Sequence, residues 1–108
     1  MSTFDQREKA FENKFAHDAE MQFKAEARRN RLLGLWAAHI MGMEEADAEA
    51  YARTVIAADL AQAGYEDVVR KVAKDLADHG ADYTQDDVRA QLLEMMVQAK
   101  QSLAEEAG

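Results

Sequence analysis

The feature that most constrains this sequence is an absence: none of its 108 residues is proline. Proline is the residue that most strongly interrupts a helix, so a chain without it can form long, continuous helices. The residues that dominate the chain, among them Ala, Glu, Lys, Leu and Gln, are also good helix formers. Its length fits one compact domain, and 48% hydrophobic residues can supply a core. The sequence therefore predicts a folded, all-α protein.

Glycines divide the chain into helical stretches. Gly42, Gly64 and Gly80 each follow an amphipathic stretch, as expected where glycine closes the last turn of a helix. Thr84 and Asp87 form an acidic variant of the capping box, which predicts another helix start. The predicted helices cover residues 4–41, 45–63, 66–78 and 84–105. Because the connections are short, we expect a four-helix bundle with a long N-terminal helix extending beyond it. Whether that N-terminal part is helical or disordered in the free protein stays open.

Several functional classes are excluded by residue type. The chain has no cysteine, and its only serines, Ser2 and Ser102, lie near its ends, so thiolate and serine nucleophiles are not expected. His17, His39 and His79 are far apart and none completes a Glu-x-x-His motif, so no metal site is predicted. His17 is either an ordinary exposed histidine or a pH switch. We find no catalytic acid–base pair, and we expect a protein that is not an enzyme.

Location and partners are constrained by charge and hydropathy. No apolar run is long enough to cross a bilayer, and the charged N-terminus does not resemble a secretory signal, so a cytoplasmic protein is expected, without direct membrane insertion. The net charge of −8 argues against nucleic-acid binding. This charge is uneven, with +1 in residues 1–31 and −9 in residues 32–108. We therefore predict a partner-binding segment, residues 1–31, followed by a helical bundle domain, residues 32–108.

The first predicted helix carries an aromatic stripe. Phe4, Phe11 and Phe15 fall within about 40° of one another on a helical wheel, and a polar stretch separates them from the apolar end of the same helix. Such a stripe either folds back to cover the bundle or inserts into a groove of another protein. No glycine lies in residues 5–31 to allow a turn, which favours partner binding. The three phenylalanines would then be the apolar anchors.

A second candidate site is the basic cluster Arg28, Arg29 and Arg31 with Asn30 and, about two turns further on, Trp36. Guanidinium groups can grip phosphate oxygens in pairs, and an indole can stack on a purine, so Arg28, Arg29, Asn30 and Trp36 are a candidate nucleotide site. The alternative is a solvated helix face paired with nearby acids, with Trp36 as a core residue. The chain has no GxxxxGK loop, so any nucleotide binding should be weak and regulatory.

Two long stretches resemble a known family. They are FDQREKAFENKFAHDAEMQFKAEARRNRLLGLWAA, residues 4–38, and DAEAYARTVIAADLAQAGYEDVVRKVAKDL, residues 47–76. Both are similar to the ζ subunit, the inhibitory subunit of the F-type ATP synthase in α-proteobacteria. The resemblance covers nearly the whole chain, although the last helix is matched in pattern more than in residues.

This resemblance implies a function. Members are four-helix proteins whose N-terminal segment inserts between an α and a β subunit of the catalytic head, reaches the γ rotor, and blocks ATP hydrolysis while leaving synthesis largely free. By implication the chain is a monomer when free, is peripheral to the inner membrane through the synthase, and needs no cofactor, although its bundle is a candidate for weak ADP or ATP binding. Arg7, Glu8 and Lys14 would pair with charged groups of the cleft around the phenylalanines. The alternatives are a nucleotide-sensing bundle, or a helical adaptor, without strong inhibitory activity.

Overall fold

The computed structural model describes the backbone of residues 2–59 and 64–107 and the side chains of residues 19–59 and 64–106. Within these ranges the secondary structure is helical, without strands, which confirms the all-α prediction. The helices are α1 (Ser2–Ile40), α2 (Glu45–Asp59), α3 (Glu66–Asp78) and α4 (Gln85–Ala107). The predicted bounds agree closely, and the expected end of the second helix, at residues 60–63, lies outside the described residues.

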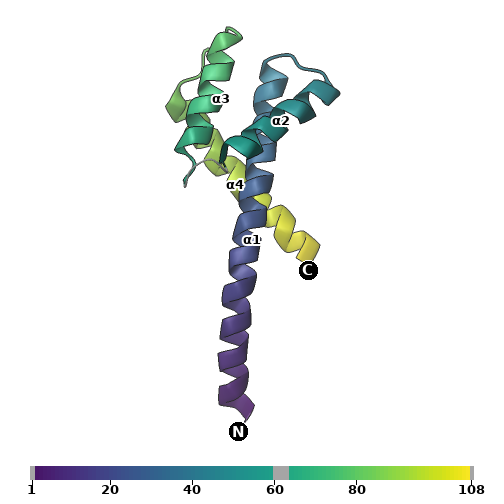
Figure 1. The fold of residues 1–108 in the computed structure, drawn as a ribbon, viewed down its shortest axis with the longest axis vertical. Helices are drawn as coiled ribbons and strands as arrows, with labels where there is room; N and C mark the ends of the chain where they lie inside the picture. The colour runs from purple at the N-terminus through teal and green to yellow at the C-terminus, as the bar shows by residue number, and fades with distance from the viewer. Residues whose placement is uncertain (1, 60–63, 108) are drawn as a thin grey trace.

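The long helix α1 forms the axis of the molecule (Figure 1). The molecule measures 65 Å along its longest direction and 25 Å and 20 Å across, and α1 runs along most of that length. The other helices gather around its C-terminal half, and α1 contacts each of them. The C-terminal end of α4 diverges from α1, so the two helices form a fork that opens toward the N-terminus (Figure 1).

The core fills the space between these helices. Leu33 and Ala37 of α1 are fully buried, as are Val55 of α2, Leu76 of α3 and Leu92 of α4. Helices α3 and α4 therefore each turn an apolar stripe toward the core. Along α4 this stripe continues to its C-terminal half, since Ala99 and Leu103 are also buried there.

Helix ends follow the local sequence signals. Gly42, Gly64 and Gly80 adopt φ values of 77°, 88° and 79°, which L side chains rarely adopt. At the start of α4, the Thr84 backbone N–H donates to Asp87 Oδ2 and the Asp87 N–H donates to Thr84 Oγ1, both at 3.0 Å. The reciprocal pair confirms the predicted capping box and sets where α4 begins.

Part of the predicted partner-binding segment, residues 1–31, packs within the bundle. Ala25, Arg29 and Asn30 belong to that segment and are buried. The reason is that other helices meet α1 here: Arg29 lies against Asp59 of α2 and Tyr65 before α3, and α4 crosses α1 where Glu106 accepts hydrogen bonds from Arg28. Burial of α1 against its neighbours therefore extends N-terminally to at least Ala25.

One close approach fixes how α1 crosses α2. A Cβ atom placed on Gly34 would lie 2.7 Å from the Ala52 Cα, far inside normal contact, and 3.2 Å from a Val55 methyl carbon. Because the nearest atom belongs to backbone, a side chain at this position would force the two helices apart.

We therefore expect Gly34→Ala to destabilise the protein by about 1 to 3 kcal/mol, the usual cost of overpacking a core. Urea denaturation measures this free energy of unfolding. The sign of the change is diagnostic, because glycine to alanine in an uncrowded helix interior is stabilising by about 0.5 to 1 kcal/mol. A more stable variant would show that α1 and α2 are not in close contact at this point.

Candidate functional site

The predicted partner-binding residues lie on the projecting part of α1. We call residues 2–18 the N-terminal arm; its backbone continues α1 as a helix beyond the bundle (Figure 1). The predicted anchors and their charged neighbours lie outside the residues whose side chains are described: Phe4, Arg7, Glu8, Phe11, Lys14 and Phe15. Their predicted roles rest on the sequence and on the helical backbone that carries them.

The arginines predicted to bind phosphate point to different neighbours. Arg29 is only 5% exposed and Asn30 only 1%. The Arg29 Nε donates to Asn30 Oδ1 at 3.0 Å, and its Nη2 lies 3.5 Å from Asp59 Oδ2 at the end of α2. The guanidinium also lies 6.0 Å from the centre of the Tyr65 ring, next to the start of α3. Arg29 therefore joins three helices from inside the bundle.

Arg28 and Arg31 face other elements. Arg28 donates to Ser102 Oγ and, with both terminal nitrogens, to the Glu106 carboxylate at 2.7 and 3.2 Å. The hydrogen bond from Arg28 holds the pKa of Glu106 below its usual value. Arg31 donates to Glu49 Oε1 of α2 at 2.5 Å. The sequence suggested partners one turn away on the same helix, whereas these partners come from α2 and α4.

Trp36 has a separate environment. Its ring packs edge-on against Tyr83, with the ring centres 5.4 Å apart and the planes at 84°, and it contacts the hydrophobic core. Its described partners thus differ from those of Arg28, Arg29 and Asn30. The four predicted nucleotide-site residues are divided among three environments.

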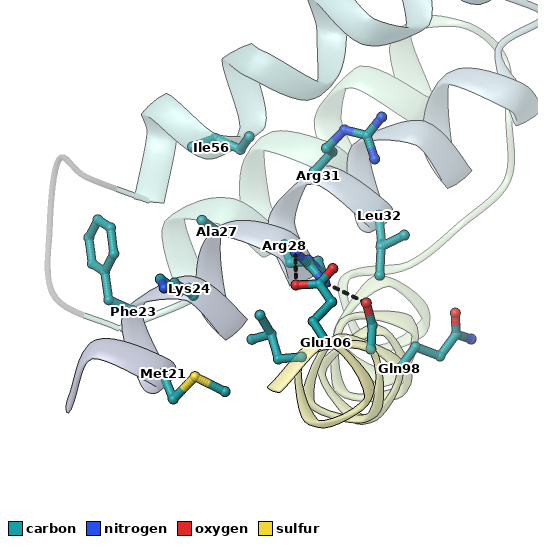
Figure 2. A pocket seen from close by; sticks show the side chains of 12 residues that line it. Met21, Phe23, Lys24, Ala27, Arg28, Arg31, Leu32, Ile56, Gln98 and Glu106 are labelled. Atoms are coloured by element: carbon teal, nitrogen blue, oxygen red, sulfur yellow. Dashed lines mark hydrogen bonds and ion pairs between the residues drawn. The ribbon is translucent and has the colours of Figure 1, made fainter. Parts of the chain in front are cut away.

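A groove lies beside the basic residues, between α1 and the C-terminal half of α4, and we call it the α1–α4 groove (Figure 2). It has a volume of about 930 Å³. The α2 residue Ile56 contributes to the wall (Figure 2). The lining residues are Met21, Phe23, Lys24, Ala27, Arg28, Arg31, Leu32, Ile56, Gln98, Ser102, Leu103 and Glu106.

Sequence reasoning missed most of this groove. Phe23 lies about 80° around the helix from Phe15 and so outside the aromatic stripe predicted from the sequence. In the structure its side chain is 63% exposed, at one end of the groove. The sequence signal that could have indicated the groove is this aromatic residue, which lies off the main apolar face of the helix. The groove itself depends on the placement of α4, which is 70 to 80 positions further along the chain.

Within the described residues, no group of three or more His, Cys, Asp or Glu side chains is placed to hold a metal ion. The same part of the chain contains no helix long and apolar enough to span a membrane.

Comparison with known proteins agrees with the architecture described above. The fold is a small helical bundle from which one helix extends. A solution NMR structure shares 48% sequence identity with this chain, with a TM-score of 0.70, and the match covers 80% of this chain and 98% of that one. The comparison with curated proteins gives no match.

The family is shown directly. The model for ATPase inhibitor subunit zeta matches residues 1–102, and the chain belongs to this family. This confirms the resemblance seen in the sequence and supports a general role in inhibiting the ATP synthase. Membership of an inhibitor-subunit family also agrees with the expectation of a non-catalytic protein.

The buried arginine suggests a stability test. We expect Asp59→Asn to lower the free energy of unfolding by about 3 kcal/mol, because it leaves the Arg29 cation buried without its carboxylate. Glu49→Gln is the matched control: it neutralises the partner of Arg31 in an exposed pair, where a loss of less than about 1 kcal/mol is expected. Chemical denaturation compares the two variants. Equal effects would show that burial does not distinguish these ion pairs.

Proposed function

We propose that this protein inhibits ATP hydrolysis by inserting its N-terminal arm between an α and a β subunit of the ATP synthase head, against the γ rotor. The observation that carries the proposal is the continuity of α1. Its N-terminal part is the arm with three phenylalanines, and its C-terminal part contributes buried residues to the core of the bundle. Membership of the ζ inhibitor family identifies the target.

The mechanism needs no chemistry on this chain. ATP hydrolysis requires the catalytic interface to open and close as the rotor turns, and a helix wedged in that interface would oppose the movement. Phe4, Phe11 and Phe15 would fill apolar pockets, which are the usual energetic centres of an interface. Arg7 and Lys14 would face acidic groups of the cleft, and Glu8 a basic one. The bundle would stay outside, since it is too wide to follow the arm.

We expect a chain that lacks residues 1–15 to lose inhibition and to keep its bundle folded. None of the described core residues lies before Ala25, so the deletion leaves the packed helices intact. ATP hydrolysis by the cognate synthase, stripped of its own inhibitor, is titrated with the full chain and with the shortened one. Circular dichroism and thermal melting verify the fold of both. Full inhibition by the shortened chain would contradict the wedge mechanism.

Weak adenine-nucleotide binding by the bundle remains a separate proposal. Its support is that Arg28 borders a groove of about 930 Å³, which has room for a small ligand. Phosphate binding there would require Arg28 to release the Glu106 carboxylate, because that pair occupies both terminal nitrogens. Because the phosphate would replace an existing ion pair, the net gain in binding free energy is small, which agrees with the expectation of low affinity.

Titration with ATP tests the nucleotide proposal. We expect millimolar ATP to shift the NMR signals of Arg28 and of Ser102 and Glu106, which line the groove with it, with saturation only at high concentration. The signals of Arg29, Asn30 and the Trp36 indole test the rest of the predicted set, because these residues do not line the groove. Inorganic phosphate at matched ionic strength is the control for nonspecific charge effects. Unchanged signals at all of these residues at millimolar ATP would contradict nucleotide binding both in the groove and at the predicted set.

A further inference from the structure

The α1–α4 groove lies at the root of the N-terminal arm. Met21, which lines its end nearest the arm, comes six residues after Phe15, so the two positions are about 9 Å apart along the helix. Both belong to the same uninterrupted helix α1. If a cleft of the partner protein encloses the arm, the outer rim of that cleft would therefore lie next to the groove.

The groove also exposes apolar surface that the fold leaves uncovered. Phe23 is 63% exposed, whereas the large core side chains such as Leu33 are fully buried. Half-buried Met21 and Ile56 line the same groove. Exposed apolar surface gathered in a concave site is typical of an interface with another protein.

The charges around this apolar surface are mostly positive. Lys24, Arg28 and Arg31 line the groove with Glu106 as the one acidic lining residue, in a chain whose net charge is −8. Each cation has an acidic partner in the free chain, and these pairs lie at the protein surface: Glu20 for Lys24, Glu106 for Arg28 and Glu49 for Arg31. Exposed ion pairs add little stability, so the cations can exchange their partners for the carboxylates of another protein. The groove thus complements a surface that is apolar at its centre and acidic at its edge.

We propose that the α1–α4 groove is a second docking site, which receives an apolar and acidic surface of the ATP synthase head at the rim of the cleft that holds the arm. This inference rests on the proposed insertion of the arm. The fork between α1 and the end of α4 opens toward the arm (Figure 1), so a partner surrounding the arm meets both walls of the groove. The second contact holds the bundle against the head and slows release of the arm.

The first test compares two substitutions of the same kind in the full-length chain. Phe23→Asp places a negative charge in the groove, and we expect at least a tenfold weaker inhibition of ATP hydrolysis, caused mainly by faster dissociation. Leu93→Asp is the matched control, because Leu93 is a 51% exposed apolar residue of α4 that does not line the groove. We expect the Leu93→Asp variant to inhibit ATP hydrolysis as strongly as the unaltered chain. Thermal melting verifies that both variants are folded.

The outcomes separate this inference from the proposed function. If the unaltered chain and Phe23→Asp inhibit equally, the docking site is wrong and insertion of the arm still stands. If the unaltered chain does not inhibit the cognate synthase, both proposals fail. If Leu93→Asp weakens inhibition as much as Phe23→Asp, the effect is one of general charge and the groove is not the docking site.

Hydrogen exchange of the full chain, with and without the synthase head, locates the contact independently. We expect added protection at residues 19–32 and 98–106 as well as in the arm, and protection confined to the arm would overturn the proposal. Light scattering of the free chain tests another occupant. A dimer that Phe23→Asp dissociates would assign the groove to a second copy and would also overturn it.

Discussion

The packing of three helices against one half of α1 is the constraint on which the rest of the structure depends. Leu33 and Ala37 are fully buried at the centre of this contact. Because Gly34 has no side chain, the backbone of α2 at Ala52 can lie close against α1. Because α1 provides a wall of the core, its direction is fixed by the whole bundle. The N-terminal arm continues that same helix, and so its direction depends on packing that begins more than one full turn beyond it.

Polar contacts around α1 divide into two groups with different consequences. Arg29 is buried between the ends of α2 and α3, where removing a partner would leave a charge without solvent or carboxylate. Arg28 and Arg31 pair with Glu106 and Glu49 at the surface, where water competes with each contact. The first group holds the bundle together. The second can rearrange, which is what a binding surface requires.

Local signals in the sequence predicted the helices well, and the arrangement of side chains between helices much less well. Glycine closures and the Thr84 capping box set helix bounds because they act within a few residues. The partners of Arg28 and Arg29 could not be predicted in this way, since Glu106 and Asp59 lie 78 and 30 positions away. The α1–α4 groove depends on the same long-range placement. The stripe of phenylalanines in the arm was visible from periodicity alone, and its roles remain predictions from the sequence.

The unbroken course of α1 has a mechanical consequence. An arm gripped at its tip by a turning rotor acts as a lever, and the bending moment is carried to the place where the helix enters the core. The close contact of Gly34 with Ala52 lies near the far end of that lever and would act as its clamp. The time for which the protein blocks the rotor would then depend on the rate at which its bundle unfolds under force. This rate is distinct from the equilibrium affinity of the protein for the synthase.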